Sequence, residues 1–344
     1  MKIHHPHIIL PAEWSEQSGV QLTWPHQDTD WMDSLDEVIP CFVSLAHEIV
    51  KREKLIIVCS NQSEVRKQLG VIDESKIIFR EIKTNDTWAR DHGGITLYID
   101  QKPFICDFAF NGWGLKFPFH WDNQITQQLY VSGTFAPYVG YLQMKHFVLE
   151  EGSIESDGCG TLMTTTRCLL SDNRNENRTK EEISLFFQLN LGIQRILWLN
   201  HGYLSGDDTD GHVDTIARFC NRDTIAYVKC EDQEDEHYQE LALMEKEIQS
   251  FRTVEGQPYR LIPLPMADQV MYNGHRLPAT YANFLIINGA VLIPFYQSPK
   301  DLEAKEQLQK VFPEREIIGI NSLPFIKQHG SIHCLTMQFP KGVF

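Results

Sequence analysis

Six short strand-like runs of this sequence each start at or beside a glycine, and they are spread along the whole chain. The runs cover residues Gly19–Trp24, Gly93–Tyr98, Gly152–Ile154, Gly211–Ile216, Asn288–Ile293 and Gly330–Leu335. Helix-like stretches stand between several of them: helical apolar spacing from Leu35 to Ile49 precedes the buried-strand pattern Leu55–Cys59. The recurrence predicts a strand, turn, strand, helix, strand unit repeated around an axis, although ordinary α/β turns produce a similar pattern. In the radial arrangement, equivalent glycines converge on the centre, where the lack of a side chain lets the backbone approach a ligand.

Length and apolar content allow a large folded core. The chain has 344 residues, 42% of them hydrophobic, which is enough for one large domain or two ordinary ones. The longest apolar region, Phe284–Phe295, is interrupted by Asn288 and Gly289 and is shorter than the roughly 20 residues that cross a bilayer. The N-terminal residues lack the continuous apolar stretch of a secretion signal. We therefore expect a cytoplasmic protein without a membrane partner.

The chain is strongly acidic, with a formal net charge of −15 at pH 7. This charge opposes nonspecific binding to nucleic acid, which depends on Lys and Arg side chains that neutralise phosphates. It favours a small cationic substrate, because an acidic cleft raises the local concentration of such a ligand. We expect no nucleic-acid partner.

Cys334 is the strongest candidate for a catalytic residue. The chain has eight cysteines and none belongs to a Cys-x-x-Cys pair, so zinc ribbons and thioredoxin-type redox chemistry are poorly supported. We interpret the other seven as small core hydrophobes with reduced thiols, at positions 41, 59, 106, 159, 168, 220 and 230. A thiol acts as a nucleophile only as thiolate beside a base or a cation, and polar motifs elsewhere in the chain supply such partners for Cys334.

Three segments carry the charged residues that a catalytic cysteine needs, and each lies within a few positions of one of the glycines. Asp91 ends a Trp-Ala-Arg-Asp motif, and Glu150 follows an apolar strand-like run. His212 and Asp214 are separated by one residue, so on an extended strand both side chains point to the same face. A surface turn or an ordinary strand end explains each motif alone, whereas together they indicate guanidine chemistry.

The acidic run around His212 does not fit a common metal site. If Gly211 were the invariant glycine of an EF-hand loop, Gly206 and Ala217 would occupy the first and last ligand positions, and neither has a side-chain oxygen. The sequence also lacks a His-Glu-x-x-His pair or a comparable helical pair for zinc. We therefore expect no metal.

Several longer motifs occur in a fixed order along the chain. They are Ala12–Trp14, Gly19–Pro25, Asn85–Asp91, Asn111–Gly114, Leu149–Glu150, Asn173–Asn175, Gly206–Asp214 and Ile332–Cys334. Together they resemble the agmatine deiminase branch of the bacterial peptidylarginine deiminase family, within the guanidine-modifying superfamily. The resemblance implies one catalytic domain over residues 1–344, folded as a five-bladed α/β propeller, the pentein fold, with its site on the axis. It also implies hydrolysis of agmatine to N-carbamoylputrescine and ammonia without a cofactor or metal. The sequence leaves open whether the chain forms a homo-oligomer, as a dimer or a tetramer.

The candidate residues suggest how such a site would work. A guanidinium is planar, permanently charged and resonance-stabilised, so water alone attacks it poorly. Asp91 and Asp214 would accept hydrogen bonds from its nitrogens and place its carbon before Cys334. The bound cation would itself favour the thiolate. His212, oriented by Glu150, would protonate the leaving nitrogen and then act as a base toward the hydrolytic water.

Three further residues are candidates for substrate binding. Trp88 and Trp113 would wall the site or stack on the guanidinium face, or else pack in the core. Asp208 would accept a hydrogen bond from the far amine of agmatine. Asp207 and Asp210 are expected to hold their loop through local backbone hydrogen bonds.

Some positions depart from the family pattern, and related activities share this chemistry. Glu151 stands where the family usually has a second glycine, and His92 and Gly94 alter the turn after the Trp-Ala-Arg-Asp motif. Alternatives with the same site are a peptidylarginine or free-arginine deiminase, and an amidinotransferase that passes the amidino group to an amine. A noncatalytic guanidine-binding protein would keep the carboxylates without needing Cys334 beside His212.

Overall fold

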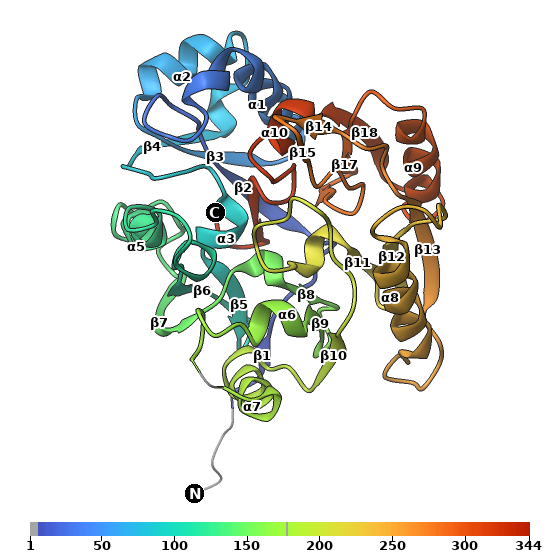
Figure 1. The fold of residues 1–344 in the computed structure, drawn as a ribbon. Helices are drawn as coiled ribbons and strands as arrows, with labels where there is room; N and C mark the ends of the chain where they lie inside the picture. Colours follow the sequence, from blue (N-terminus) through green and yellow to red (C-terminus); the bar gives the residue numbers. More distant parts are fainter. Residues whose placement is uncertain (1–5, 177) are drawn as a thin grey trace, which may run out of the picture.

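The computed structural model describes residues 6–176 and 178–344. These residues form a mixed α/β structure with five sheets of three or four strands, which lie around the middle of the molecule (Figure 1). In strand order, the sheets are β1 (Ile8–Ile9), β5 (Ile95–Ile99), β6 (Lys102–Ala109) and β7 (Gly140–Val148); β10 (Arg195–Leu199), β9 (Thr161–Thr165) and β8 (Ile154–Ser156); β11 (Ala217–Asn221), β12 (Thr224–Lys229) and β13 (Arg260–Pro265); β16 (Leu285–Ile287), β17 (Ala290–Phe295) and β18 (Glu316–Asn321); and β19 (Thr336–Pro340), β2 (Gln17–Thr23), β3 (Lys54–Cys59) and β4 (Ile77–Glu81). A separate hairpin joins β14 (Met271–Tyr272) to β15 (His275–Arg276).

Each of the five sheets repeats one pattern of strand pairing. An antiparallel pair is followed by a strand that runs parallel to its neighbour, as in β5–β6–β7 and β8–β9–β10. The same order holds in the other three sheets. A helix connects the two parallel strands, because a parallel connection must cross from one end of the sheet to the other. The connecting helices are α5 (Ile125–Val131), α7 (Lys180–Leu191), α8 (Tyr238–Ser250), α9 (Lys300–Gln309) and α1 (Leu35–Val50).

The two ends of the described chain share one sheet. β19 pairs with β2 in antiparallel register, with Thr336 opposite Leu22. Gly19 and Gly330 therefore lead into the same sheet, which explains why six glycine-led runs correspond to five sheets. Gly289 differs from the others, since it lies in the turn between β16 and β17 with φ of +74° and with no heavy atom within 4 Å of its Cβ position. The prediction of a central position is wrong for this glycine.

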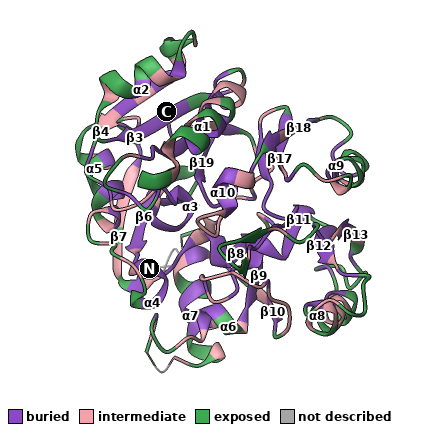
Figure 2. Cartoon of the chain, turned by 45° about the horizontal axis from the view of Figure 1, so that its top comes forward, coloured by how far each residue is buried: buried purple, intermediate pink, exposed green. Residues whose placement is uncertain are grey.

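The long helices bury one face and leave the other exposed (Figure 2). In α1, the buried residues include Val38, Phe42, Leu45 and Ile49, as their spacing predicts. Pro40 lies inside this helix, beyond its first turn. It is tolerated because it is exposed, so water can solvate the carbonyl group that loses its helical N–H partner.

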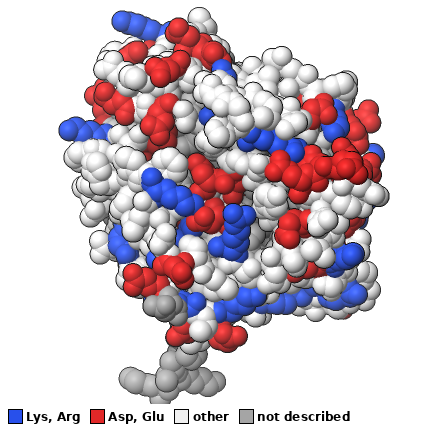
Figure 3. Space-filling view, in the orientation of Figure 1, with Lys and Arg blue, Asp and Glu red and all other residues white. Residues whose placement is uncertain are grey.

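Short helical segments stand at strand ends and in the connections between strands. They are α2 (Gln62–Leu69), α3 (Ala89–His92), α4 (Gly112–Leu115), α6 (Thr166–Leu169), α10 (Leu323–Ile326), and the 3-10 turns η1 (Met32–Ser34), η2 (Glu74–Lys76), η3 (Asp122–Gln124), η4 (Glu151–Ser153) and η5 (Val213–Thr215). Within residues 6–176 and 178–344, no helix combines the length and the apolar character needed to span a bilayer. Acidic side chains occur over much of the face in Figure 3, in keeping with the net charge of −15.

Glu53 makes the stability of the fold depend on pH. One oxygen of its buried carboxyl accepts a hydrogen bond from Nδ2 of Asn288 at 2.6 Å, and the other has no partner among the described residues. Burial raises the pKa of Glu53 to about 7, although a hydrogen bond from the backbone N–H group of Asn288 opposes this rise. The folded pKa exceeds the unfolded value of about 4.3, so the contribution to stability is complete below that value and is lost as the pH rises through 7.

Glu53→Gln is therefore expected to raise the melting temperature at pH 8 by about 2–4 °C, because it removes the cost of burying a carboxylate. The melting temperature of the variant should also fall less between pH 5 and pH 8 than that of the wild type. Thermal unfolding followed by circular dichroism across this range checks both effects. If the melting temperatures of the two proteins change with pH by the same amount, the pH dependence of stability does not come from Glu53.

Candidate active site

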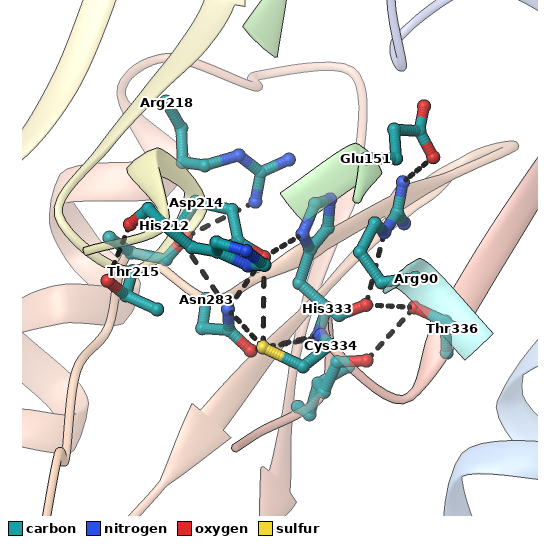
Figure 4. A network of polar contacts seen from close by, with 12 residues as sticks. Arg90, Glu151, His212, Asp214, Thr215, Arg218, Asn283, His333, Cys334 and Thr336 are labelled. Atoms are coloured by element: carbon teal, nitrogen blue, oxygen red, sulfur yellow. Dashed lines mark hydrogen bonds and ion pairs between the residues drawn. The ribbon is translucent and has the colours of Figure 1, made fainter. Parts of the chain in front are cut away.

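The five predicted catalytic side chains lie near the ends of strands from three different sheets. Asp91 is in α3 before β5, Glu150 follows β7, His212 and Asp214 lie at η5 before β11, and Cys334 precedes β19. All five are buried, with exposed fractions of 0% to 4%. Figure 4 shows the side chains of Cys334, His212 and Asp214 close together.

The two candidate guanidinium-binding carboxylates share one feature: one oxygen of each accepts a hydrogen bond from the protein, and the other has no hydrogen-bond partner among the described residues. Oδ2 of Asp91 accepts a hydrogen bond from Nε1 of Trp113 at 2.9 Å. Oδ2 of Asp214 accepts hydrogen bonds from Nδ1 of His333 at 2.7 Å and Nδ2 of Asn283 at 3.2 Å. Oδ1 of each carboxylate is buried without a hydrogen-bond partner among the described residues. Because buried polar atoms rarely lack partners, these two oxygens are suited to the donors of a ligand.

The surroundings shift the pKa values of these carboxyls in opposite directions. Burial raises the pKa of Asp91 to about 6, although nearby His212 opposes the shift. Burial also disfavours the charged form of Asp214, but the hydrogen bond and the charge of His333 outweigh it and hold the pKa below its usual value. Both carboxyls are therefore mainly ionised at neutral pH, which favours a cationic ligand.

His212 is fully buried and pairs with Asp91. Nδ1 of His212 is 3.6 Å from Oδ1 of Asp91, and neither ring nitrogen has a hydrogen-bond partner in the described part of the chain. Burial disfavours the imidazolium, but the charge of Asp91 and contacts with Cys168 and Glu150 outweigh it and raise the pKa of His212 to about 10. The ring therefore holds a proton at neutral pH that it can donate to a leaving group.

Glu150, which we expected to orient His212, is held by Arg174. Nε of Arg174 donates to both carboxylate oxygens at 3.0 Å, and both side chains are fully buried. Arg174 also donates to Asp210 at 2.6 Å and to the carbonyl oxygen of Thr209 at 2.7 Å, which ties Glu150 to the loop that carries His212. Since a carboxylate oxygen of Glu150 lies within 4.8 Å of a ring nitrogen of His212, it acts on the imidazolium through its charge.

Gly152 brings the backbone into the middle of the site. A Cβ atom at this position would lie 2.6 Å from Nδ1 of His212, 2.8 Å from Oδ1 of Asp91 and 3.3 Å from Oδ2 of Asp214. No side chain fits there, so this position requires glycine. The close approach predicted for the glycine-led runs is confirmed at this position.

Cys334 lines a cavity of about 100 Å³. Its Sγ atom is 3.1 Å from Nδ2 of Asn283 and 3.7 Å from Oδ2 of Asp214. Burial, followed by the charges of Asp214 and Asp91, raises the pKa of the thiol well above its usual value. A cation bound between the two carboxylates would offset their charge and favour the thiolate.

The cavity beside Cys334 is acidic. Carboxylates at positions 30, 86, 91 and 208 line it, and its lining within the described residues includes no Lys or Arg. Burial raises the pKa of Asp208 to about 6, and the charge of His329 opposes the shift. Asp208 thus lies in the same cavity as the nucleophile, and the lining suits a ligand with more than one positive charge.

Trp88 and Trp113 both line the cavity and pack in the core, and a role in substrate binding stays a prediction for both. Each is 5% exposed. Nε1 of Trp88 donates a hydrogen bond to Asp86 at 3.0 Å, much as Trp113 does to Asp91. Residues 112–115, which include Trp113, form a left-handed turn with φ between +54° and +85°. Such φ values cost about 1–2 kcal/mol for each non-glycine residue, and strain of this kind is common at functional sites.

Asp207 and Asp210 hold the loop before His212 in different ways. Asp207 accepts hydrogen bonds from two backbone N–H groups of the loop at 2.7 and 3.1 Å, as predicted. Asp210 is bound by the side chains of Lys116 and Arg174. The expected backbone role is therefore confirmed for Asp207, and for Asp210 it is replaced by ion pairs.

Two groups of side chains in the described residues have the spacing of metal ligands. They are Glu150 with Cys168 and His212, and Glu13 with Glu155 and His333. An arginine forms salt bridges with the carboxylates of each group, Arg174 in the first and Arg218 in the second. The guanidinium groups already neutralise these carboxylates, and the absence of a metal from the reaction stays a prediction.

Three residues of the site were not assigned a role from the sequence: Arg174, Asn283 and His333. Arg174 stands in an Asn-Arg-Asn motif and His333 is next to the nucleophile, so both had a positional signal. Asn283 had none, because it lies in a largely apolar stretch and reaches Cys334 across 51 residues of sequence.

The geometry can be compared with known proteins. A profile of the Porphyromonas-type peptidyl-arginine deiminases matches residues 9–340. The chain belongs to this family. It is 32% identical over 356 aligned positions to an agmatine deiminase of Pseudomonas aeruginosa strain LESB58, with 96% of the chain and 95% of the relative covered.

Solved structures extend the comparison. A substrate-bound agmatine deiminase of C. jejuni has a TM-score of 0.93 and 34% identity, over 100% of the chain and 99% of that protein. A Porphyromonas gingivalis protein described as a candidate arginine deiminase has a TM-score of 0.95 and 51% identity, over 98% of the chain and 99% of that protein. The Porphyromonas-type deiminase fold therefore covers nearly the whole chain.

Proposed function

We propose that the protein is an agmatine deiminase, a hydrolase that converts agmatine and water to N-carbamoylputrescine and ammonia through a covalent amidino-cysteine intermediate. The proposal rests on one observation: among the described residues, Oδ1 of Asp91 and Oδ1 of Asp214 are both buried without hydrogen-bond partners, on carboxyls whose charges act on Cys334. Relatives named agmatine deiminases, which align with 96% or more of the chain, support the same substrate.

Asp91 and Asp214 bind the guanidinium group in this scheme. The free oxygen of each carboxylate accepts hydrogen bonds from the guanidinium nitrogens, and such charge-assisted bonds fix the plane of the group. The central carbon then faces Sγ of Cys334 within about 3–3.5 Å, as a near-attack geometry requires. The bound charge offsets the two carboxylates and lets the thiol lose its proton to solvent.

The first chemical step breaks a carbon–nitrogen bond. The thiolate attacks the guanidinium carbon and gives a tetrahedral adduct, in which the C–S bond is new and the former C=N electron pair rests on nitrogen. The imidazolium of His212 donates its proton to the terminal NH₂ group, which leaves as ammonia. The amidino group, which still carries the alkylamine chain, stays on Cys334.

The second step releases the product. Neutral His212 takes a proton from water as the water oxygen attacks the amidino carbon. The C–S bond then breaks and the thiolate returns, the remaining hydroxyl proton passes to solvent, and the oxygen from water stays on the product as the ureido carbonyl. The carboxylates hold the reacting carbon in place through both steps.

The acidic lining predicts a preference for agmatine over arginine. Agmatine carries a second positive charge, for which Asp208 is the proposed acceptor, whereas arginine would bring a carboxylate toward Asp208 and its acidic neighbours. We expect kcat/KM for arginine to be at least about 100-fold lower, which corresponds to roughly 2.7 kcal/mol.

Ammonia release from both compounds measures this ratio. Asp208→Asn should lower the ratio of kcat/KM for agmatine to kcat/KM for arginine, because it raises KM for agmatine. Glu231→Gln, outside the cavity, should leave this ratio unchanged. Equal turnover of arginine and agmatine by the wild type would refute the selectivity.

The reaction itself is tested by the products. Purified protein incubated with agmatine should release ammonia and N-carbamoylputrescine in equal amounts. Transfer of the amidino group to an added amine would indicate an amidinotransferase instead. If the purified protein forms neither ammonia nor the ureido product from agmatine, the deiminase proposal is wrong.

The remaining expectations about the whole chain belong to the same proposal. The five similar sheets around the site support a five-bladed propeller that forms one catalytic domain over residues 1–344. The proposed reaction uses only side chains and water, so it needs no cofactor or metal. A nucleophile that must stay reduced supports a cytoplasmic location. Dimer or tetramer formation stays a prediction.

A further inference from the structure

Asn283 lies directly before β16 and touches the nucleophile and its backbone. The residue is 1% exposed. Its Nδ2 atom is 3.1 Å from Sγ of Cys334 and 3.2 Å from Oδ2 of Asp214. Its Oδ1 atom accepts hydrogen bonds from the backbone N–H groups of His333 at 3.1 Å and Cys334 at 3.3 Å. One amide therefore connects the sulfur, a substrate-binding carboxylate and the nucleophile backbone (Figure 4).

We propose that Asn283 is a further catalytic residue, whose amide N–H group stabilises the thiolate of Cys334 and occupies Oδ2 of Asp214, so that Oδ1 stays free for the guanidinium. This inference deepens the proposed function, because it takes Cys334 as the nucleophile.

The chemistry of the sulfur environment explains why an amide is required there. Asp214 and Asp91 both disfavour a negative charge on Sγ, and burial acts in the same direction. The amide of Asn283 supplies a neutral donor that lowers the cost of the thiolate without competing with the cationic substrate. An aspartate at the same place would lose this donor and add a further negative charge.

The two carboxylate oxygens of Asp214 have different surroundings. Asn283 and His333 both donate to Oδ2, while Oδ1 has no partner among the described residues. If the amide were absent, Asp214 could rotate and share both oxygens with the protein. The amide therefore keeps one oxygen available for the substrate.

Asn283→Asp and Asn283→Ala test the inference, the first with the same side-chain shape and the second without the side chain. Asn288→Ala is the matched control, because the side chain of Asn288 also makes hydrogen bonds through both ends but lies at the β16–β17 turn, bound to Gln17 and Glu53. The readouts are the rate at which iodoacetamide alkylates Cys334 without substrate, followed by mass spectrometry of the peptide that carries it across a range of pH, and kcat and KM with agmatine. Circular dichroism confirms that each variant is folded.

We expect both Asn283 variants to move the alkylation midpoint to higher pH and to lower kcat by roughly 10- to 100-fold, as loss of a hydrogen bond to a charged group predicts. The midpoint of Asn288→Ala should match the wild type. If both Asn283 variants keep the wild-type midpoint of Cys334 alkylation, the inference is wrong even if kcat falls. Asn283 would then have only a packing role. Alkylation of Cys334 requires no agmatine. If the wild type does not turn over agmatine, the proposed function is wrong, but the alkylation experiment still tests the role of Asn283.

Discussion

Replacement of Cys334 with alanine should abolish ammonia release from agmatine, with a loss of about 10⁴- to 10⁶-fold in kcat. The sulfur is the protein atom that forms a bond to the guanidinium carbon in this scheme, so His212 and the carboxylates have no covalent intermediate to act on without it. Since Asp91 and Asp214 keep their free oxygens in the variant, agmatine should still bind. Single-turnover and steady-state ammonia assays measure the loss, and calorimetric titration measures binding.

Cys106→Ala is the matched control for this variant. Cys106 is also a buried free cysteine, but it packs in β6 within the hydrophobic core. Its removal should lower stability by about 1 kcal/mol and leave kcat unchanged. Ammonia release by Cys334→Ala within tenfold of the wild type would show that the chemistry proceeds without the thiol and would sink the covalent mechanism.

The sequence patterns predicted the repeated strand and helix unit because each sheet uses the same order of local signals. Glycine before a strand, an apolar strand and an amphipathic helix are all properties of a few neighbouring residues. Gly152 is the informative case, since its close approach to His212 and Asp91 follows from its position before β8. Gly289 has the same local pattern and a different role, because a turn between two strands also selects glycine.

The residues proposed to be catalytic could be selected from the sequence because their chemical types are rare in apolar surroundings. The contacts between them were not. Arg174, rather than His212, holds Glu150, and Asp91 pairs with His212 across more than a hundred residues of sequence. These contacts depend on which strand ends lie next to one another in the folded protein. The spacing of residues along the sequence does not determine that arrangement.

Asn283 and the turn at residues 112–115 are two further features that the sequence alone could not predict. An amide in a largely apolar stretch usually indicates a strand end or a turn, so only its distance of 3.1 Å from Sγ reveals its role. Likewise, positive φ values at Trp113 and Leu115 contradict the backbone preference of both residues. Tertiary contacts, including the hydrogen bond from Trp113 to Asp91, stabilise that turn.

Replacement of His212 with glutamine should lower kcat by about 10²- to 10⁴-fold and change KM much less, because the ring acts on the leaving group and the water rather than on binding. The wild-type ring has a pKa of about 10, so it is protonated at neutral pH and loses its acid function as the pH rises through that value. The wild-type kcat should therefore fall above pH 10, whereas the residual activity of the variant should lack this fall.

His47→Gln is the control for the His212 variant, because His47 lies in α1 and hydrogen-bonds the carbonyl group of Leu69 far from Cys334. It should keep the wild-type profile. Steady-state ammonia assays from pH 6 to 11 supply both profiles, with circular dichroism to define the range in which each protein stays folded. A His212→Gln enzyme with the same alkaline fall as the wild type would assign that proton to another group. A large rise in KM with unchanged kcat would instead make His212 a binding residue and would assign the protonation of the departing nitrogen to another group.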